Sequence, residues 1–159
     1  MLTLRPAAPH DIPLILAFIR ELATYERLAH EVKATEELLQ ESLFAAPSTV
    51  EVILAFYGEE PAGFAVVFPN FSTFLGRPGL YLEDLYVRPH LRGCGIGRAL
   101  LTHLARLTQE RGYGRLEWAA LNWNEPALAF YRHLGATPLD DWIGFRLTGE
   151  ALAQLAQAE

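Results

Sequence analysis

Apolar residues recur at two different periods along this chain, and the change from one period to the other predicts its elements. Across residues 10–26 they return every three or four positions, which is the period of one helix face. Residues 50–57 and 62–68 are instead rich in β-branched and aromatic side chains and flank a Gly-Glu-Glu-Pro turn, which is typical of a β-hairpin. Further strands are expected at residues 2–5, 80–87, 115–120 and 142–147, and further helices at 96–111, 125–133 and 149–157 and from the N-cap Thr35 onward.

Strands dominate the first half of the chain and alternate with helices in the second half. That order predicts a mixed sheet flanked by helices, of the α/β (α+β) class. With 159 residues the chain has the length of one domain, and we expect a single domain over residues 1–159.

Composition and charge exclude several classes of function. A net charge of −6 disfavours a nucleic-acid partner, and no apolar run is long enough to cross a bilayer. A single cysteine, Cys94, rules out an internal disulfide and fits a reducing cytoplasm. The five histidines show no metal-ligand spacing, so we expect no metal. The sequence therefore predicts a cytoplasmic protein without nucleic-acid or membrane partners.

A glycine-rich turn joins the strand at residues 80–87 to the helix at residues 96–111. The first N–H groups of a helix have no internal partner, and glycines let a phosphate approach them closely. Arginines add positive charge beside this loop: Arg88, Arg92 and Arg98. A dinucleotide fingerprint fails because Arg98 stands at its third glycine, and no Gly-Lys-Ser/Thr triplet exists. The loop is interpreted as a phosphate or pyrophosphate cradle, with an ordinary tight turn as the alternative.

The pattern Arg92-x-x-Gly95-x-Gly97, after a strand and at the start of a helix, resembles the acetyl-CoA signature of the GNAT acetyltransferases. The stretch from Asn124 to Tyr131 resembles the second cofactor segment of that family. Likeness to the diamine (spermidine/spermine) and thialysine acetyltransferase branch is carried by Glu21-Leu22-Ala23-x-Tyr25-Glu26, Tyr81-Leu82-Glu83-Asp84 and Trp123-Asn124-Glu125-Pro126.

This resemblance implies a mostly antiparallel sheet that is splayed at its centre, with helices on both faces. It implies that acetyl-CoA is the cosubstrate and that the chain forms a homodimer. Asn124 would cap its helix and contact the pantetheine arm. The other residues implied to bind the cosubstrate are Leu85, Tyr86 and Val87 along the strand, and Arg92, Gly93, Cys94, Gly95, Ile96, Gly97 and Arg98 in the loop.

Tyr131 lies seven residues after Asn124, so both project from one face of a helix. A phenol can protonate a departing thiolate, which makes Tyr131 the expected general acid, with ordinary core packing as the alternative. Cys94 has no histidine base nearby in the sequence, so we expect no covalent acetyl-enzyme.

Glu83 and Asp84 are consecutive in an apolar strand, so we expect them on opposite faces, where at least one carboxylate needs a partner. Glu83 could accept a proton from the amine substrate or anchor a distal ammonium group, and a structural ion pair is the alternative. By resemblance, Tyr25 and Glu26 join Glu83 and Asp84 in the substrate site, although a solvated helix end explains these two equally well.

We expect an N-acetyltransferase that moves the acetyl group of acetyl-CoA to a primary amine of a small molecule by direct transfer in a ternary complex. Ile143 and Phe145 stand where the branch would have an acid and a tryptophan, which weakens the case for spermidine and leaves thialysine or lysine-like amines. The alternatives are acetylation of a peptide or protein amine, a non-catalytic acyl-CoA sensor, and a nucleotide-binding regulatory domain.

Overall fold

Five strands form one sheet in the order β1-β2-β3-β4-β5. The first four pair antiparallel and β5 pairs parallel to β4, which confirms the predicted mixed, mostly antiparallel sheet. The computed structural model describes residues Met1–Glu159 and contains two compact units, Met1–Ala119 and Ala120–Glu159. The prediction of a single domain over the whole chain stays a prediction. The strands are β1 (Leu2–Pro6), β2 (Glu51–Tyr57), β3 (Glu60–Ser72), β4 (Arg77–Val87) and β5 (Leu116–Trp118).

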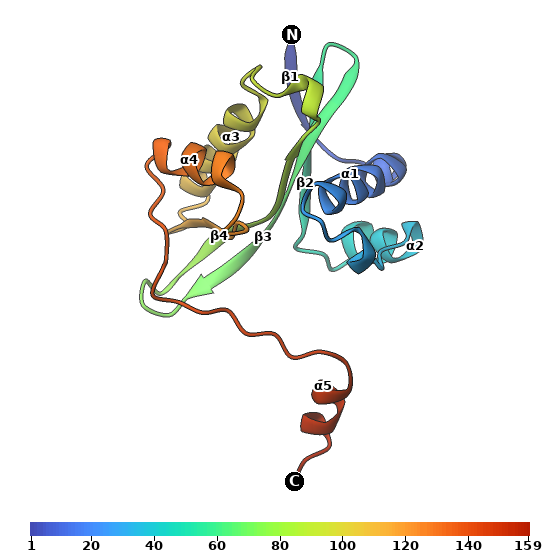
Figure 1. Cartoon of the computed structure of the whole chain (residues 1–159), viewed down its shortest axis with the longest axis vertical. Coiled ribbons are helices and arrows are strands. Elements are labelled where there is room, and N and C mark those ends of the chain that lie inside the picture. Colours follow the sequence, from blue (N-terminus) through green and yellow to red (C-terminus); the bar gives the residue numbers. More distant parts are fainter. The chain divides into compact units, whose positions relative to one another are not determined.

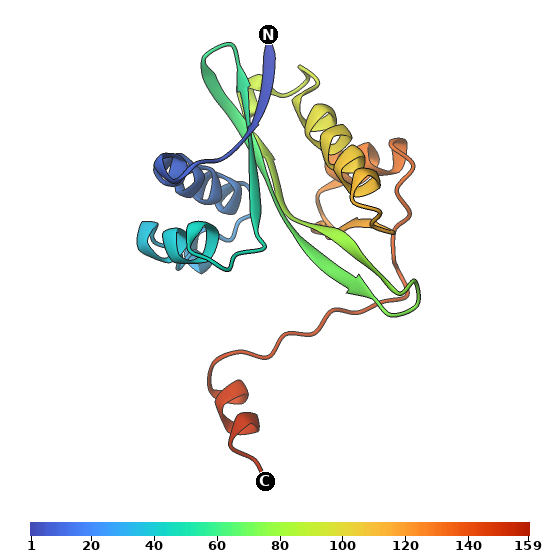
Figure 2. The same ribbon diagram turned by 180° about the vertical axis from the view of Figure 1, so that it is seen from behind.

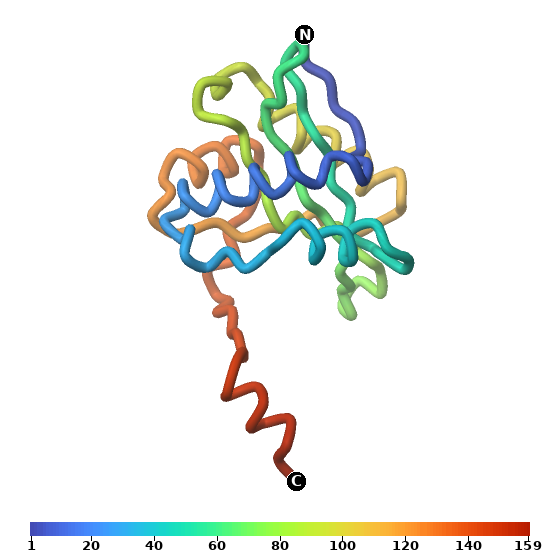
Figure 3. Tube along the Cα trace, turned by 90° about the vertical axis from the view of Figure 1, so that its right-hand side faces the viewer, coloured from blue at the N-terminus to red at the C-terminus, as the bar shows by residue number.

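In the first unit, helices cover both faces of the sheet (Figures 1 and 2). On one face α1 (Ile12–Tyr25) crosses the strands, with α2 (Glu36–Leu39) beside it (Figure 3). On the other face lies α3 (Ile96–Glu110). The second unit contains α4 (Glu125–His133) and α5 (Gly149–Ala156). None of these helices has both the length and the apolar character that a membrane span requires.

The core beneath α1 is aromatic. Phe18 of α1 and Phe64 of β3 are fully buried with their ring centroids 5.3 Å apart, and the Tyr86 ring of β4 lies 6.1 Å from Phe18. On the opposite face α3 buries Ile96, Leu100 and Leu104, a stripe with the four-residue spacing that the sequence pattern shows. Helices therefore pack on both faces of the sheet, α1 on one face and α3 on the other, and hold the strands that lead to the glycine loop.

Most sequence-predicted elements form, with shifted ends. Thr35 caps α2, because its hydroxyl accepts a hydrogen bond from the Leu38 N–H at 3.2 Å. The strands expected at residues 62–68 and 80–87 are longer than predicted: β3 continues to Ser72 and β4 begins at Arg77, which leaves only a short turn between them. The strand expected at residues 142–147 is wrong: these residues form no strand. β propensity alone does not make a strand, because its N–H and C=O groups need a neighbouring strand.

An ion pair ties α1 to the end of β4. The Glu21 carboxylate accepts hydrogen bonds from Arg88 Nε at 3.1 Å, from Arg88 Nη2 at 3.0 Å and from the Tyr86 hydroxyl at 3.1 Å. The Arg88 guanidinium also lies 4.9 Å from the Phe18 ring centroid and donates to the Pro61 carbonyl at 3.1 Å. These contacts join α1, β3 and β4 just before the glycine loop, so they position the start of that loop.

Glu21→Ala should lower the free energy of unfolding by about 1–2 kcal/mol at neutral pH, because Arg88 would stay half-buried without its acid. Arg88 holds the pKa of Glu21 below its ordinary value, so the contribution of the pair is present above that ordinary value and is lost as the pH falls through the lowered one. Urea unfolding at neutral and acid pH measures both effects. In the control, Glu51→Ala removes a more exposed pair with Arg111 and should cost less than about 1 kcal/mol. Equal losses in the two variants would contradict the anchoring role of Glu21.

Candidate active site

The loop between β4 and α3 holds two glycines in the left-handed conformation. Their φ angles are +80° at Gly93 and +81° at Gly95, which residues with a Cβ rarely adopt. Leu91 is buried and fixes the preceding turn, and α3 begins at Ile96 with no side chain capping its first N–H groups. A Cβ on either glycine would meet no atom within 4 Å. The loop therefore offers N–H groups and unobstructed space to an anion, which fits the pyrophosphate of a CoA ester.

The arginines around this loop differ in their partners. Arg88 is held in the ion pair with α1. Arg92 folds back toward α1: its Nε donates to the Val87 carbonyl at 2.9 Å, and its guanidinium lies 4.6 Å from the centroid of the Tyr25 ring. Arg98 forms no hydrogen bond or ion pair within the Met1–Ala119 unit. It borders an open cleft of about 410 Å³ between α3 and β1. Of these three arginines, Arg98 is therefore the one whose guanidinium has no hydrogen-bond or ion-pair partner within this unit.

β4 separates from β5 after a short contact. Only three residue pairs join the two strands, the last of them Leu82 with Trp118. From residue 84 to residue 87, β4 stays paired with β3 and has no strand on its other edge, which confirms the predicted splay. Leu85, Tyr86 and Val87 lie along this free edge, where an extended ligand arm can pair with backbone groups. Because the Tyr86 side chain is buried, Tyr86 can offer only its backbone there.

A β-bulge lies at the point of separation. The register passes from the pair Val66–Asp84 to the pair Val67–Leu82, so Glu83 is an extra residue without a partner in β3. A bulge interrupts the alternation of side chains between the two faces of a sheet. The expectation that Glu83 and Asp84 occupy opposite faces is therefore wrong.

Both carboxylates lie on the face that α1 covers. Asp84 pairs with Val66, which packs against the core beneath α1, and cross-strand partners share a face. Tyr81, two residues before Glu83, packs its ring 5.3 Å from that of Phe68, two residues after Val66. Glu83 and Asp84 therefore project to the same side, at the position where β4 leaves β5.

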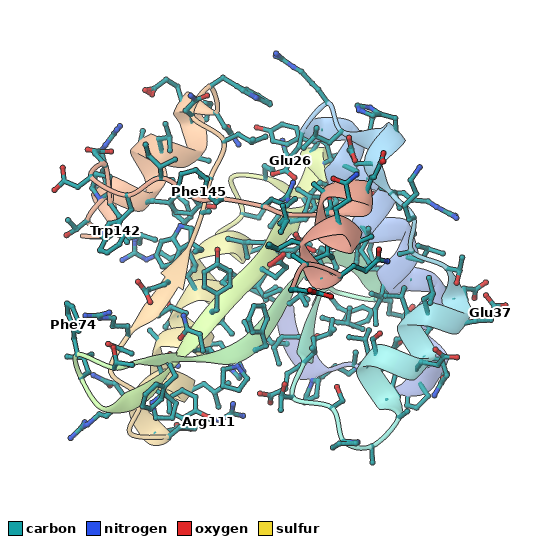
Figure 4. The ribbon with its side chains drawn as sticks, turned by 90° about the horizontal axis from the view of Figure 1, so that it is seen from below. Glu26, Glu37, Phe74, Arg111, Trp142 and Phe145 are labelled. Atoms are coloured by element: carbon teal, nitrogen blue, oxygen red, sulfur yellow. The ribbon has the colours of Figure 1, made fainter.

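Glu26 follows α1 at its C-terminal end (Figure 4). Its charge and that of Glu83 both act on Asp84, so the three residues form an acidic cluster. Burial, with smaller contributions from the charges of Glu83 and Glu26, raises the pKa of Asp84 from 3.8 to about 6. Burial also raises the pKa of Glu26, whereas the Glu83 side chain is exposed. No hydrogen bond or ion pair joins any of the three carboxylates to the Met1–Ala119 unit. Such a cluster favours a cationic ligand.

In the second unit, α4 carries the remaining predicted residues. Asn124 occupies the N-cap position of α4, as the resemblance implied, although its side chain makes no capping hydrogen bond. The first turn is instead closed by backbone, with Leu128 N–H donating to the Asn124 carbonyl at 3.0 Å. The Tyr131 ring lies 5.7 Å from that of Phe130. Both Asn124 and Tyr131 take part in further interactions, and their roles in catalysis and binding stay predictions.

Residues 16–136 match the Acetyltransferase (GNAT) family. The chain belongs to the GNAT family. It is an N-acetyltransferase, and GNAT acetyltransferases use acetyl-CoA as their cosubstrate. The loop with uncapped N–H groups and the free edge of β4 fit that cosubstrate. The structure holds no group of three or more His, Cys, Asp or Glu residues that could bind a metal ion.

Relatives and solved structures indicate which GNAT enzymes this chain resembles. The thialysine N-epsilon-acetyltransferase of Bos taurus is 38% identical over 164 residues, covering 96% of this chain and 96% of that protein. The L-ornithine N5-acetyltransferase of Arabidopsis thaliana is 31% identical over 194 residues, covering 94% and 85% respectively. The structure of an integron cassette protein of V. cholerae superposes with a TM-score of 0.82 at 30% identity, covering 99% and 98%. The predicted resemblance to the thialysine acetyltransferase branch of the GNAT family is confirmed.

Two features of this GNAT site are not indicated by sequence patterns alone. Glu21 belongs to a segment that carries the resemblance, but no pattern indicates that it anchors Arg88 and Tyr86. The only sequence signal for the bulge at Glu83 is a pair of carboxylates in an otherwise apolar strand. A carboxylate pair of this kind conflicts with regular alternation, and a bulge removes the conflict.

Gly95→Ala should weaken binding of CoA to this GNAT enzyme by at least about tenfold, because a Cβ at φ +81° strains the loop and occupies the space beside it. Isothermal titration of CoA measures the affinity. Gly76→Ala is the matched control, since Gly76 has a φ of +65° and lies in the turn between β3 and β4. The control should lose similar stability and keep its affinity; equal CoA affinity in both variants would rule out the loop as the binding site.

Proposed function

We propose that this enzyme transfers the acetyl group of acetyl-CoA to a primary amine of a small molecule, by direct transfer in a ternary complex. The position of Glu83 and Asp84 at the point where β4 leaves β5 carries the proposal. An ammonium ion attracted to these carboxylates would meet a thioester arm laid along the free edge of β4. The uncapped N–H groups at the start of α3 lie at the far end of the same strand and would hold the pyrophosphate.

The amine is proposed to belong to a small diamine, such as thialysine, a lysine-like amino acid or a polyamine. Relatives named for thialysine and ornithine support an amino acid with a side-chain amine. Three carboxylates in one cluster can hold a second ammonium group as well as the reacting one. In this proposal Tyr25 and Glu26 line the amine site together with Glu83 and Asp84. The Tyr25 ring also contacts Arg92 beside the loop.

The reaction follows from the chemistry of these groups. A primary amine arrives protonated, with an ordinary pKa of about 10.4, and must lose a proton before it attacks. Glu83 belongs to the site as proton acceptor or as anchor of the distal ammonium. A backbone N–H near Leu85 on the free edge would stabilise the oxyanion of the tetrahedral intermediate. Tyr131 is proposed to protonate the departing thiolate, and Asn124 to contact the pantetheine arm.

An amine panel tests the proposal. With acetyl-CoA, thiol release should be fastest with thialysine, ornithine or lysine, slower with spermidine and putrescine, and negligible with a peptide. Thiol-reagent absorbance measures the rate, and mass spectrometry identifies the product. Fastest turnover of the peptide would favour protein acetylation. CoA binding without any thiol release would identify an acyl-CoA sensor, and tighter binding of ATP or NAD than of CoA would indicate a nucleotide-binding regulator.

Tyr131→Phe should lower kcat by about 10²- to 10⁴-fold, because no other proposed group supplies a proton to the thiolate. Phe130→Leu is the matched control: it alters the neighbouring aromatic contact on α4 without removing a proton donor. Steady-state kinetics with the best amine give kcat, and circular dichroism checks the helix content. Turnover by Tyr131→Phe at the rate of the control would exclude Tyr131 as the acid.

Residence in the cytoplasm and assembly as a homodimer belong to the same proposal. Support for the dimer comes from apolar surface in the second unit, where Trp142 is 76% exposed, Ile143 78% and Phe145 95%. Figure 4 labels Trp142 and Phe145 on the segment between α4 and α5. A second copy would cover such surface.

A further inference from the structure

Leu85 and Val87 present their backbone groups to the free edge of β4. The Arg88 N–H donates to the Ala62 carbonyl beside β3 at 2.8 Å. Residues along an antiparallel strand face the neighbouring strand and the opposite edge alternately, so Arg88 and Tyr86 face β3, whereas Leu85 and Val87 face the free edge. An extended ligand arm that carries amide groups would therefore meet a carbonyl acceptor at both positions.

Arg92 occupies one of these two acceptors. Its Nε donates to the Val87 carbonyl at 2.9 Å. A guanidinium is a charged donor, and hydrogen bonds from charged groups are about twice as strong as those from neutral amides. A ligand amide that took this carbonyl would replace a stronger donor with a weaker one. Between residues 84 and 87, the Leu85 carbonyl is therefore the free-edge acceptor that remains for a ligand.

Two aromatic rings hold the Arg92 side chain in this position. Its guanidinium carbon lies 4.6 Å from the centroid of the Tyr25 ring and 5.8 Å from that of Tyr86. Each such contact contributes about 0.5–1 kcal/mol at an exposed site. The Tyr86 hydroxyl is itself fixed by a hydrogen bond of 3.1 Å to Glu21. Groups from α1 and from β4 thus keep Arg92 at the Val87 carbonyl.

The turn after α1 fixes the position of Tyr25. The Leu28 N–H donates to the Ala23 carbonyl at 2.8 Å, and the Arg27 N–H donates to the Thr24 carbonyl at 3.1 Å. These are the two hydrogen bonds of a Schellman turn. Arg27 adopts a left-handed φ of +63°, which a residue with a Cβ keeps only where the surrounding structure imposes it. Because this turn ends α1 at Tyr25, the ring that supports the guanidinium has a defined place.

Resting on the proposed function, we propose that Arg92 is a positioning residue that fixes the register of the acetyl-CoA arm along β4. Free-edge acceptors recur at every second residue of a strand, about 6.6 Å apart, so an arm could pair at Leu85 or slip to Val87. Arg92 caps the second position and leaves one register. Anchoring of the pyrophosphate in the loop does not fix the register, because the arm consists mainly of rotatable single bonds. A misplacement of about 1 Å can already cost about 100-fold in rate.

Two substitutions separate this hydrogen bond from the charge of Arg92. Arg92→Gln places an amide N–H where Nε stands and removes the charge, whereas Arg92→Met has similar length and removes both. With the best amine, kcat should fall at least about tenfold in Arg92→Met and stay within about threefold of wild type in Arg92→Gln. Titration calorimetry should give CoA affinities within about threefold of wild type for both, because peptide N–H groups hold the pyrophosphate.

Arg20→Met is the matched control, since it removes an exposed arginine of α1. It should change neither kcat nor CoA affinity. Arg92 is also exposed, so its variants should fold, and circular dichroism checks this.

A second measurement needs no turnover. With carbon-13 at the thioester carbonyl, acetyl-CoA bound to the wild type and to Arg92→Gln should give one carbonyl resonance at the same chemical shift. Arg92→Met should give a second or displaced resonance, because its arm can adopt the other register. One shared resonance in all three proteins would overturn the proposal.

The remaining outcomes separate the two proposals. If both variants lose CoA affinity by about tenfold or more, the guanidinium is a ligand of the anion and the positioning role is overturned. Equal values of kcat in Arg92→Met and Arg92→Gln also overturn it. If the wild type acetylates no amine, the proposed function fails, while the carbonyl resonances still decide the role of Arg92.

Discussion

One extra residue in β4 determines the geometry of the site. Glu83 has no partner in β3, so the pairing of β4 with β3 shifts by one residue there: Asp84 lies opposite Val66, and Leu82 lies opposite Val67. A bulge bends its strand and increases its twist, and this one lies where contact with β5 ends. The bulge cannot slide along the strand, because aromatic contacts fix it from both sides: Phe68 with Tyr81, and Phe18 with Tyr86. The shared face of the two carboxylates follows from this single register shift, and the free edge of β4 begins at the same position.

The two charged ends of the site are built differently. The amine end uses ionised side chains with no cation among them. The anion end combines the peptide N–H groups of the loop with Arg98, since Arg88 is already paired and Arg92 is turned back onto Tyr25. None of these groups forms an ion pair with the carboxylates of the amine end within the Met1–Ala119 unit. Opposite ligands can therefore occupy neighbouring positions without the protein neutralising its own groups.

The structural features that the sequence predicts correctly are those determined by residues close together in the chain. The apolar stripe of α3, the cap at Thr35 and the glycine loop are local patterns, and each forms as expected. The Glu21–Arg88 contact joins residues 67 positions apart, and no spacing rule indicates it. The bulge depends on how two strands are paired, which neither strand encodes alone. The strand expected at residues 142–147 fails for the same reason, since a strand forms only against a partner.

The backbone of the glycine loop has a thermodynamic consequence. Its curvature is fixed by two left-handed φ angles, by buried Leu91 before it and by the start of α3 after it. The loop therefore loses its conformational entropy when the protein folds, and ligand binding does not have to order it. A preorganised loop of this kind keeps more of its contact energy as affinity and places no slow rearrangement before association. Acetyl-CoA capture by this enzyme would then be limited by diffusion and orientation rather than by loop closure.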